Sequence, residues 1–201
     1  MVSVSLLDQR SEQVLIDALA RTRQGMTIWF TGLSGAGKTT LCRMVCTELR
    51  SLGLNVEILD ADEVRPRICP DLGYSRQDRC DNLRRIGYIA GLLSRNGVVT
   101  LVATISPYRN IREELRDQLE RFVEVYVDAD LAVCEMRDPK GLYRKARAGR
   151  LSNLTGVDDP YEPPVSPEMI CHTGVETPHQ SAAKVVKLIL DSCFQSRGDD
   201  E

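Results

Sequence analysis

The sequence predicts an α/β fold of three layers, α/β/α, in which helices cover both faces of a mainly parallel central sheet of about five strands. Short apolar runs alternate with longer segments of helical periodicity, which is the order expected of parallel strands joined by right-handed helical crossovers. A glycine-rich loop stands between the first such strand and the first such helix. The 201 residues are enough for one well-packed domain.

The first strand is expected at 27–31 and the first helix at 38–52, where Gly53 supplies the stop signal. A second strand at 55–59 runs into the acidic stretch 60–63. In parallel sheets ligands bind beyond the carboxyl ends of the strands, and both the glycine-rich loop and the acids fall there.

A long helix is expected at 76–95, where apolar residues recur at helical spacing until Gly97 breaks the pattern. The next strand, 98–103, is almost wholly apolar, as is typical of a strand covered on both faces. Residues 138–167 are rich in proline, glycine and charge and are expected to be irregular. The remaining elements are expected as a helix at 107–121, a strand at 122–127, a helix at 131–137, a strand at 169–171 and a helix at 178–194.

The composition is that of a globular protein, with 42% hydrophobic and 27% charged residues. A net charge of −3 gives no reason to expect a nucleic-acid or membrane partner. No apolar run is long enough to span a membrane, and no basic-then-apolar signal pattern stands at the N-terminus. The seven cysteines lack C-x-x-C spacing and are expected to be buried thiols. We therefore expect a cytoplasmic protein.

The glycine-rich loop, GLSGAGKT, fits the pattern G-x-x-x-x-G-K-[S/T] between a strand and a helix, which predicts a phosphate-binding loop. Its glycines let backbone N–H groups approach phosphate oxygens at a helix start. Lys38 is expected to reach the β- and γ-phosphates, and the Thr39 hydroxyl to bind Mg²⁺. The loop therefore predicts binding of a nucleoside triphosphate and Mg²⁺ through Gly32, Leu33, Ser34, Gly35, Ala36, Gly37, Lys38, Thr39 and Thr40.

Two carboxylates follow the second strand. Asp60 and Asp62 are two residues apart, so they point the same way if the strand geometry persists. One would then hold a Mg²⁺-bound water and the other would take a hydroxyl proton. The alternative is that Asp62 and Glu63 simply start the next turn.

A basic segment interrupts this acidic protein between two glycines, Gly141 and Gly149, that could act as hinges. A mobile lid that closes over phosphates is one interpretation, and a solvated helix face is the other. Its cations are Lys140, Arg144, Lys145, Arg147 and Arg150.

Ser106 and Pro107 precede the helix expected at 107–121. Serine followed by proline is typical of a helix N-cap and first position. The N–H groups of the same helix start could also hold an anion on the ligand side.

Together these stretches resemble the adenylylsulfate kinase family, whose members phosphorylate the 3′-hydroxyl of adenosine 5′-phosphosulfate (APS) with ATP to give PAPS and ADP. The resemblance covers roughly residues 24 to 190 and rests on GLSGAGKTT, LDADEVR, DLGYS, NLRRIG, ISPYR, DPKGLYRKARAG and TGVDDPYEPP. It implies a P-loop kinase fold with a basic lid, a role in sulfate activation, a homodimer and a functional link to ATP sulfurylase. From the residues themselves we expect an N-terminal extension at 1–24, with a helix at 9–23, and a polar tail at 196–201, which leaves the kinase domain at 25–195.

The resemblance assigns roles residue by residue. The catalytic residues would be Lys38, Asp62 and Ser106, with Thr39 and Asp62 at the metal. The adenine of ATP would be flanked by Arg137, Thr177 and Pro178. The acceptor APS would be bound by Asp60, Asp62, Arg65, Tyr74, Arg79, Asn82, Ile105, Ser106, Lys140 and Leu154.

Some positions differ from the family pattern. The acidic motif D-G-D-N becomes D-A-D-E here, so Glu63 adds a charge, and Cys80 replaces a polar residue. Leu154 stands where a phenylalanine usually sandwiches the acceptor adenine, and the lost stacking is worth about 1 kcal/mol. Tyr74 also replaces a phenylalanine but keeps its aromatic face. The family's serine at 106 has been described as a phosphoserine intermediate, whereas we expect direct in-line transfer.

Two alternatives stay open on the sequence alone. The first is a kinase of the same scaffold with another nucleotide or anionic acceptor, which the changes at Leu154 and Glu63 would permit. The second is a non-catalytic nucleotide-binding partner of ATP sulfurylase, although Lys38 and Asp62 are both present.

Overall fold

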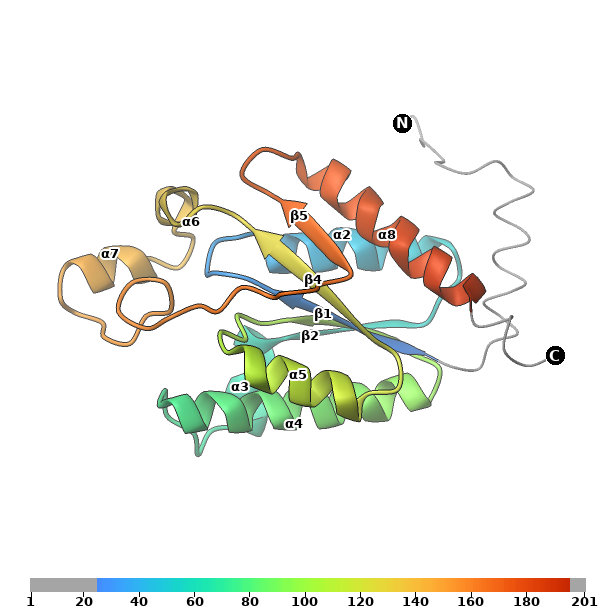
Figure 1. The fold of residues 1–201 in the computed structure, drawn as a ribbon, viewed down its shortest axis with the longest axis horizontal. Helices are drawn as coiled ribbons and strands as arrows, with labels where there is room; N and C mark the ends of the chain where they lie inside the picture. Colours follow the sequence, from blue (N-terminus) through green and yellow to red (C-terminus); the bar gives the residue numbers. More distant parts are fainter. Residues whose placement is uncertain (1–24, 196–201) are drawn as a thin grey trace.

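A computed structural model of the chain describes residues 25–195, so the helix expected at 9–23 and the tail at 196–201 lie outside the described residues. Five parallel strands form one sheet in the order β2-β3-β1-β4-β5 (Figure 1). The strands are β1 (Met26–Thr31), β2 (Val56–Asp60), β3 (Val99–Ala103), β4 (Phe122–Asp128) and β5 (Met169–His172).

Helices cover both faces of this sheet, which confirms the three-layer prediction. Figure 1 shows α2 and α8 on one face and α3, α4 and α5 on the other, while α6 and α7 extend from one end. The helices are α2 (Lys38–Ser51), α3 (Ala61–Ile68), α4 (Arg76–Arg95), α5 (Arg109–Gln118), α6 (Leu131–Arg137), α7 (Leu142–Arg147) and α8 (Pro178–Gln195).

The central strand β1 feeds both cores because alternate side chains point to opposite faces. Ile28 and Phe30 pack into the larger core with residues of α2 and α8. Trp29 packs into the smaller core with residues of α4 and α5, among them Ile86 and Ile111. All six residues of β1 are buried, as expected of a strand between two helical layers.

Two helices differ from the main expectation: α3 was not expected, and a helix in the basic segment was only the alternative interpretation. α3 begins directly after β2 and includes Pro66, and α7 lies within the segment expected to be irregular. Both are short and mainly polar, so neither has the apolar periodicity that predicts a helix. The helix expected from residue 107 begins instead at Arg109.

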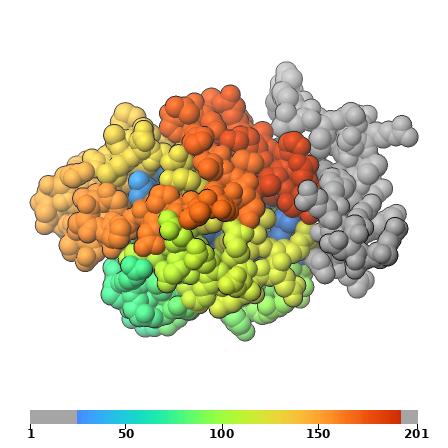
Figure 2. All heavy atoms as spheres, in the orientation of Figure 1, coloured from blue at the N-terminus to red at the C-terminus, as the bar shows by residue number. Residues whose placement is uncertain are grey.

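Figure 2 shows the outer surface of the same view. Blue atoms from the first described part of the chain are visible in a hollow between the yellow and orange atoms of later segments. In residues 25–195, every helix is too short or too polar to cross a lipid bilayer.

Candidate active site

The glycine-rich loop joins the carboxyl end of β1 to α2. Gly32, Gly35 and Gly37 have φ angles of 151°, 77° and 107°, in the region that favours glycine. A Cβ atom on Gly32 would lie 2.4 Å from the Val127 carbonyl oxygen, and one on Gly35 would lie 2.9 Å from that of Cys134. Gly32 and Gly35 are therefore required by both conformation and space, and Gly37 by conformation.

Lys38 begins α2, and its ammonium group turns back along the loop. It donates to the carbonyl oxygens of Gly32 at 2.9 Å and Leu33 at 2.7 Å. Burial, with a further contribution from the positive charge of Lys140, lowers the pKa of Lys38 to about 8. The cation thus lies against the loop that is predicted to hold phosphate.

The strand geometry does not persist beyond Asp60, so the condition under which Asp60 and Asp62 would point the same way is not met. The strand ends at Asp60, which caps α3 by accepting the Asp62 N–H at 3.0 Å and also accepts the Thr39 hydroxyl at 2.6 Å. Asp62 lies in the first turn of α3, is exposed, and forms an ion pair with Lys140. Asp62 and Glu63 thus lie in the first turn of a helix, and the predicted role of Asp62 stays a prediction.

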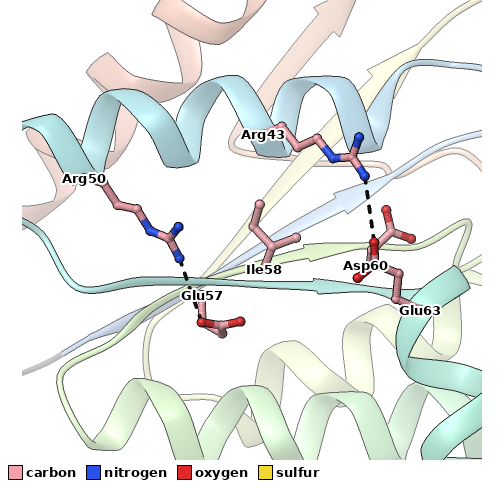
Figure 3. A pocket seen from close by; sticks show the side chains of 6 residues that line it. All are labelled: Arg43, Arg50, Glu57, Ile58, Asp60 and Glu63. Carbon is pink, nitrogen blue, oxygen red and sulfur yellow. Dashed lines mark ion pairs between the residues drawn. The ribbon is translucent and has the colours of Figure 1, made fainter.

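A pocket of about 280 Å³ lies beside Asp60, between α2 and β2 (Figure 3). Figure 3 shows Arg43 of α2 directed toward Glu63 of α3, and their charged atoms are 3.8 Å apart. Arg50 and Glu57 are 3.9 Å apart at the other end of the pocket. The additional negative charge of Glu63 is therefore opposed by Arg43.

The basic segment forms α7, which packs on the phosphate-binding loop. Gly141 and Gly149 flank it with φ angles of 65° and 66°. The Tyr143 side chain is buried, and its hydroxyl donates to the Ser34 carbonyl oxygen at 2.9 Å. The segment is therefore not merely a solvated helix face, and its movement as a lid stays a prediction.

Arg65 and Tyr74 lie together at the ends of α3 and of the following turn. The Arg65 guanidinium carbon is 4.3 Å from the centre of the Tyr74 ring, within cation–π range. Tyr74 is 68% exposed, so its ring also offers a face to a ligand.

Arg79 and Asn82 lie on the next helix, α4. Arg79 donates to the Thr155 hydroxyl at 2.7 Å and lies 3.4 Å from an Asp159 carboxylate oxygen. Asn82 is 4% exposed, and its amide oxygen has no hydrogen-bond partner within residues 25–195. A buried polar atom without a partner is unusual in a folded protein and marks a position where a ligand or water fits.

Ile105 and Ser106 follow β3, as expected, but Ser106 does not cap a helix. Its φ angle is 41°, and its hydroxyl accepts from Trp29 Nε1 at 3.1 Å and donates to the Thr31 hydroxyl at 2.9 Å. The first N–H of α5, that of Arg109, is bound by the Glu162 carboxylate at 2.7 Å instead. The capping prediction is therefore wrong because the Ser106 hydroxyl already has two partners.

The Leu154 side chain is not exposed beside the other predicted acceptor residues. It is 6% exposed and packs in the larger core. Its predicted contact with an acceptor adenine stays a prediction.

Of the residues predicted to flank the adenine of ATP, Arg137 contacts the phosphate-binding loop. Arg137 donates to the carbonyl oxygens of Gly35 at 3.3 Å and Ala36 at 3.5 Å. Thr177 accepts the Gln180 N–H at 3.3 Å and precedes Pro178, the first residue of α8.

Similarity to known protein families and structures identifies the family of this chain. The family described as adenylylsulphate kinase matches residues 24–172. The chain belongs to the adenylylsulfate kinase family. It is therefore a kinase, an ATP-dependent transferase.

Three relatives of this adenylylsulfate kinase family illustrate the match. The "Adenylyl-sulfate kinase" of Synechococcus sp. (strain JA-3-3Ab) is 55% identical over 170 residues, which are 85% of this chain and 94% of that protein. The structure of the Mycobacterium tuberculosis APS kinase CysC in complex with AMPPNP and APS has a TM-score of 0.79 and 40% identity, covering 83% of this chain and 98% of that one. The "Probable bifunctional SAT/APS kinase 2" of Sorangium cellulosum is 52% identical over 81% of this chain but only 28% of its own length.

Three side chains beside the predicted acceptor site of this adenylylsulfate kinase family member were not predicted from the sequence. Thr155 and Asp159 bind the Arg79 guanidinium group. The Tyr161 hydroxyl oxygen lies 2.9 Å from the Thr31 hydroxyl oxygen. The motif TGVDDPYEPP contains all three, so its acidic and aromatic residues were the available signal.

Proposed function

We propose that this chain transfers the γ-phosphate of ATP to the 3′-hydroxyl of APS, giving PAPS and ADP. The observation that carries the proposal is the position of Asp62 within the family's motif. Asp62 stands at the carboxyl end of the sheet and forms an ion pair with Lys140. Its N–H donates to Asp60, which also accepts the hydroxyl of Thr39 in the phosphate-binding loop.

In the proposed reaction the 3′-oxygen of the acceptor forms a bond to the γ-phosphorus while the bond from that phosphorus to the β–γ bridging oxygen breaks. ADP leaves with that electron pair, and the hydroxyl proton passes to the Asp62 carboxylate. Loop N–H groups and Lys38 would hold the phosphates, and Lys140, which pairs with Asp62, would neutralise charge on the transferred group.

Direct transfer needs no serine nucleophile. The Ser106 side chain is buried and both of its hydroxyl interactions are with protein groups. We therefore propose that Ser106 lines the acceptor site and is not phosphorylated during turnover.

The residues around Asp60 fit Mg²⁺. The Thr39 hydroxyl and the Asp60 carboxylate meet at 2.6 Å, and Mg²⁺ prefers oxygen ligands of this kind. We propose that Thr39 and Asp62 hold the ion, with Asp60 orienting Thr39. When bound, Mg²⁺ would neutralise charge on the β- and γ-phosphates.

The acceptor would be held by residues from α3, α4 and the segment after β3. We propose that Arg65, Arg79 and Asn82 bind the phosphosulfate group and that the exposed Tyr74 ring stacks on the adenine. On the ATP side, Arg137, Thr177 and Pro178 would flank the adenine. Ile105, Ser106, Lys140 and Leu154 would complete the acceptor site.

The wider context is also a proposal. We infer a kinase domain at 25–195 preceded by an extension at 1–24, a cytoplasmic homodimer, and a functional link to an ATP sulfurylase that supplies APS. The Sorangium relative supports the link, because its name describes a bifunctional SAT/APS kinase.

The test is ADP release by the purified protein with Mg²⁺ and ATP, in the presence and absence of APS, with PAPS identified by mass. APS-dependent ADP release with PAPS formed is the expected result. ATP binding without APS-dependent release would contradict the proposal and favour another acceptor or a regulatory role.

A further inference from the structure

Arg112 of α5 is a buried arginine that joins three separate segments. Its side chain is 2% exposed. Nε donates to Glu124 of β4 at 2.7 Å, one terminal nitrogen donates to the Ser106 carbonyl oxygen at 2.6 Å, and the other donates to the Glu162 carbonyl oxygen at 2.7 Å. Glu124 neutralises the charge, so the guanidinium group can be buried with each of its nitrogens bonded.

The first of these segments has a conformation that needs support. Ser106 has a left-handed φ of 41°, a strained conformation for a residue other than glycine that persists where the surroundings hold it. Trp29 and Thr31 hold the Ser106 hydroxyl, and Arg112 holds its carbonyl oxygen. Arg112 is thus the group that fixes the main chain at this position from the α5 side.

The second segment carries the partners of Arg79. Glu162 is fixed to the start of α5, because its N–H donates to the Pro107 carbonyl oxygen at 2.8 Å and its carboxylate accepts the Arg109 N–H. A few residues earlier in the same segment, Thr155 and Asp159 contact the Arg79 guanidinium group. The contact between Arg112 and Glu162 therefore anchors the segment that orients Arg79.

We propose that Arg112 is a positioning residue for the acceptor nucleotide, acting through the Ser106 main chain and through the 155–162 segment that holds Arg79. The proposal rests on the proposed function, which assigns Ser106 and Arg79 to the acceptor. It predicts a larger effect on the acceptor than on ATP, because Arg112 bonds the Ser106 and Glu162 main chain, whereas α7 contacts the nucleotide loop through Tyr143.

Arg116 provides a matched control one turn further along α5. It also pairs with Glu124, at 3.3 Å, and donates to Glu168 at 2.9 Å. Its polar contacts in the described part of the chain are with these two carboxylates, and they leave Ser106 and Glu162 untouched. Arg116→Lys therefore perturbs the same buried acid without reaching either acceptor segment.

The test uses the full chain and two variants of Arg112. Arg112→Lys keeps the charge opposite Glu124 but cannot reach three partners, since an ammonium group lacks the planar fork of arginine. The double variant Arg112→Gln with Glu124→Gln removes both charges together, so no unpaired charge is left buried if the first variant fails to fold. For each we would measure the melting temperature, kcat, KM for APS and for ATP, and AMPPNP affinity by calorimetry.

We expect KM for APS to rise about tenfold or more in both Arg112 variants, because a displaced contact residue weakens binding sharply. KM for ATP and AMPPNP affinity should stay close to the parent values, and Arg116→Lys should leave both KM values unchanged. An unchanged KM for APS in a folded Arg112 variant would overturn the proposal, as would equal increases for both substrates. A parent protein without any APS-dependent rate would instead contradict the proposed function itself, and this inference with it.

Discussion

Asp60 and Asp62 are close in sequence but have different surroundings. Asp60 is 7% exposed and bonded to Thr39, whereas Asp62 is exposed beside Lys140. The difference arises because β2 stops at Asp60, whose carboxylate caps α3. Asp60 is thereby suited to hold the loop, and Asp62 to meet a substrate.

We expect Asp62→Asn to lower kcat by about a hundredfold or more, because the amide cannot accept the hydroxyl proton. AMPPNP affinity should be largely retained, since the loop and Lys38 are unaltered. Steady-state rates and calorimetry would check both. Glu63→Gln, which removes the neighbouring exposed carboxylate of α3, is the control and should keep most of the activity. Near-normal rates in Asp62→Asn would refute its assigned role.

Ser106→Ala should reduce turnover only moderately if transfer is direct. The change also leaves Trp29 Nε1 without its partner, so the free energy of unfolding should fall by about 1–3 kcal/mol. Denaturant unfolding and ADP release would be measured on the same preparation. Complete loss of activity in a folded variant, together with phosphate trapped on Ser106 of the parent protein, would contradict direct transfer.

At the scale of elements, α7 is the connection between the basic segment and the phosphate-binding loop. The carboxylate of Asp138 accepts the N–H groups of Tyr143 at 3.2 Å and Arg144 at 3.0 Å. Although desolvation alone would raise the pKa of Asp138, these backbone hydrogen bonds hold it below its usual value. The helix is therefore fixed at its start by Asp138 and on its inner face by Tyr143.

Tyr143→Phe should loosen α7 from the loop by removing the hydrogen bond to Ser34, at a cost of about 1 kcal/mol. We expect KM for ATP to rise severalfold with a small change in melting temperature. Lys187→Gln breaks the exposed ion pair with Asp191 on α8 and serves as the control, because surface pairs contribute little. If both variants behave alike, the inner contact of α7 has no particular role in nucleotide binding.

At the scale of the whole molecule, buried thiols make stability depend on pH. Burial raises the pKa of the cysteines at 42, 46, 80, 134 and 171, that of Cys171 to about 11. Thiols of the unfolded chain have a pKa of about 8.5, so above that pH the unfolded chain binds fewer protons than the folded one. The contribution of these thiols is therefore fully present below about pH 8.5 and is lost as the pH rises through their folded values.

We expect the urea midpoint to fall between about pH 8 and pH 10. Lys38 acts in the opposite direction, because its pKa is lowered to about 8 in the folded state and stability from this group rises with pH. It is a single group, whereas five cysteines act the other way. Cys171→Ala should have a shallower pH dependence than the parent. A midpoint that rises over this range would show that the thiols are not the dominant groups.

The fold could be predicted largely from the periodicity of apolar residues. The strands are short apolar runs, and helices α4 and α6 agree with the expected residue ranges. α3 and α7 could not, because capping by Asp60 and packing of Tyr143 stabilise them rather than any repeating pattern. The phosphate-binding loop was predictable since its signal is local. Arg112 was not, because its three partners are distant in sequence and only the folded chain brings them together.

Trp29 is the only tryptophan of the chain, and it lies fully buried with its indole N–H bonded to Ser106. Its fluorescence therefore originates from a single known place, directly behind the segment assigned to the acceptor. A ligand that shifts the Ser106 main chain would change the emission of this indole, whereas one confined to the adenine side of the nucleotide loop would leave it nearly constant. The protein thus contains its own optical reporter of which substrate has bound.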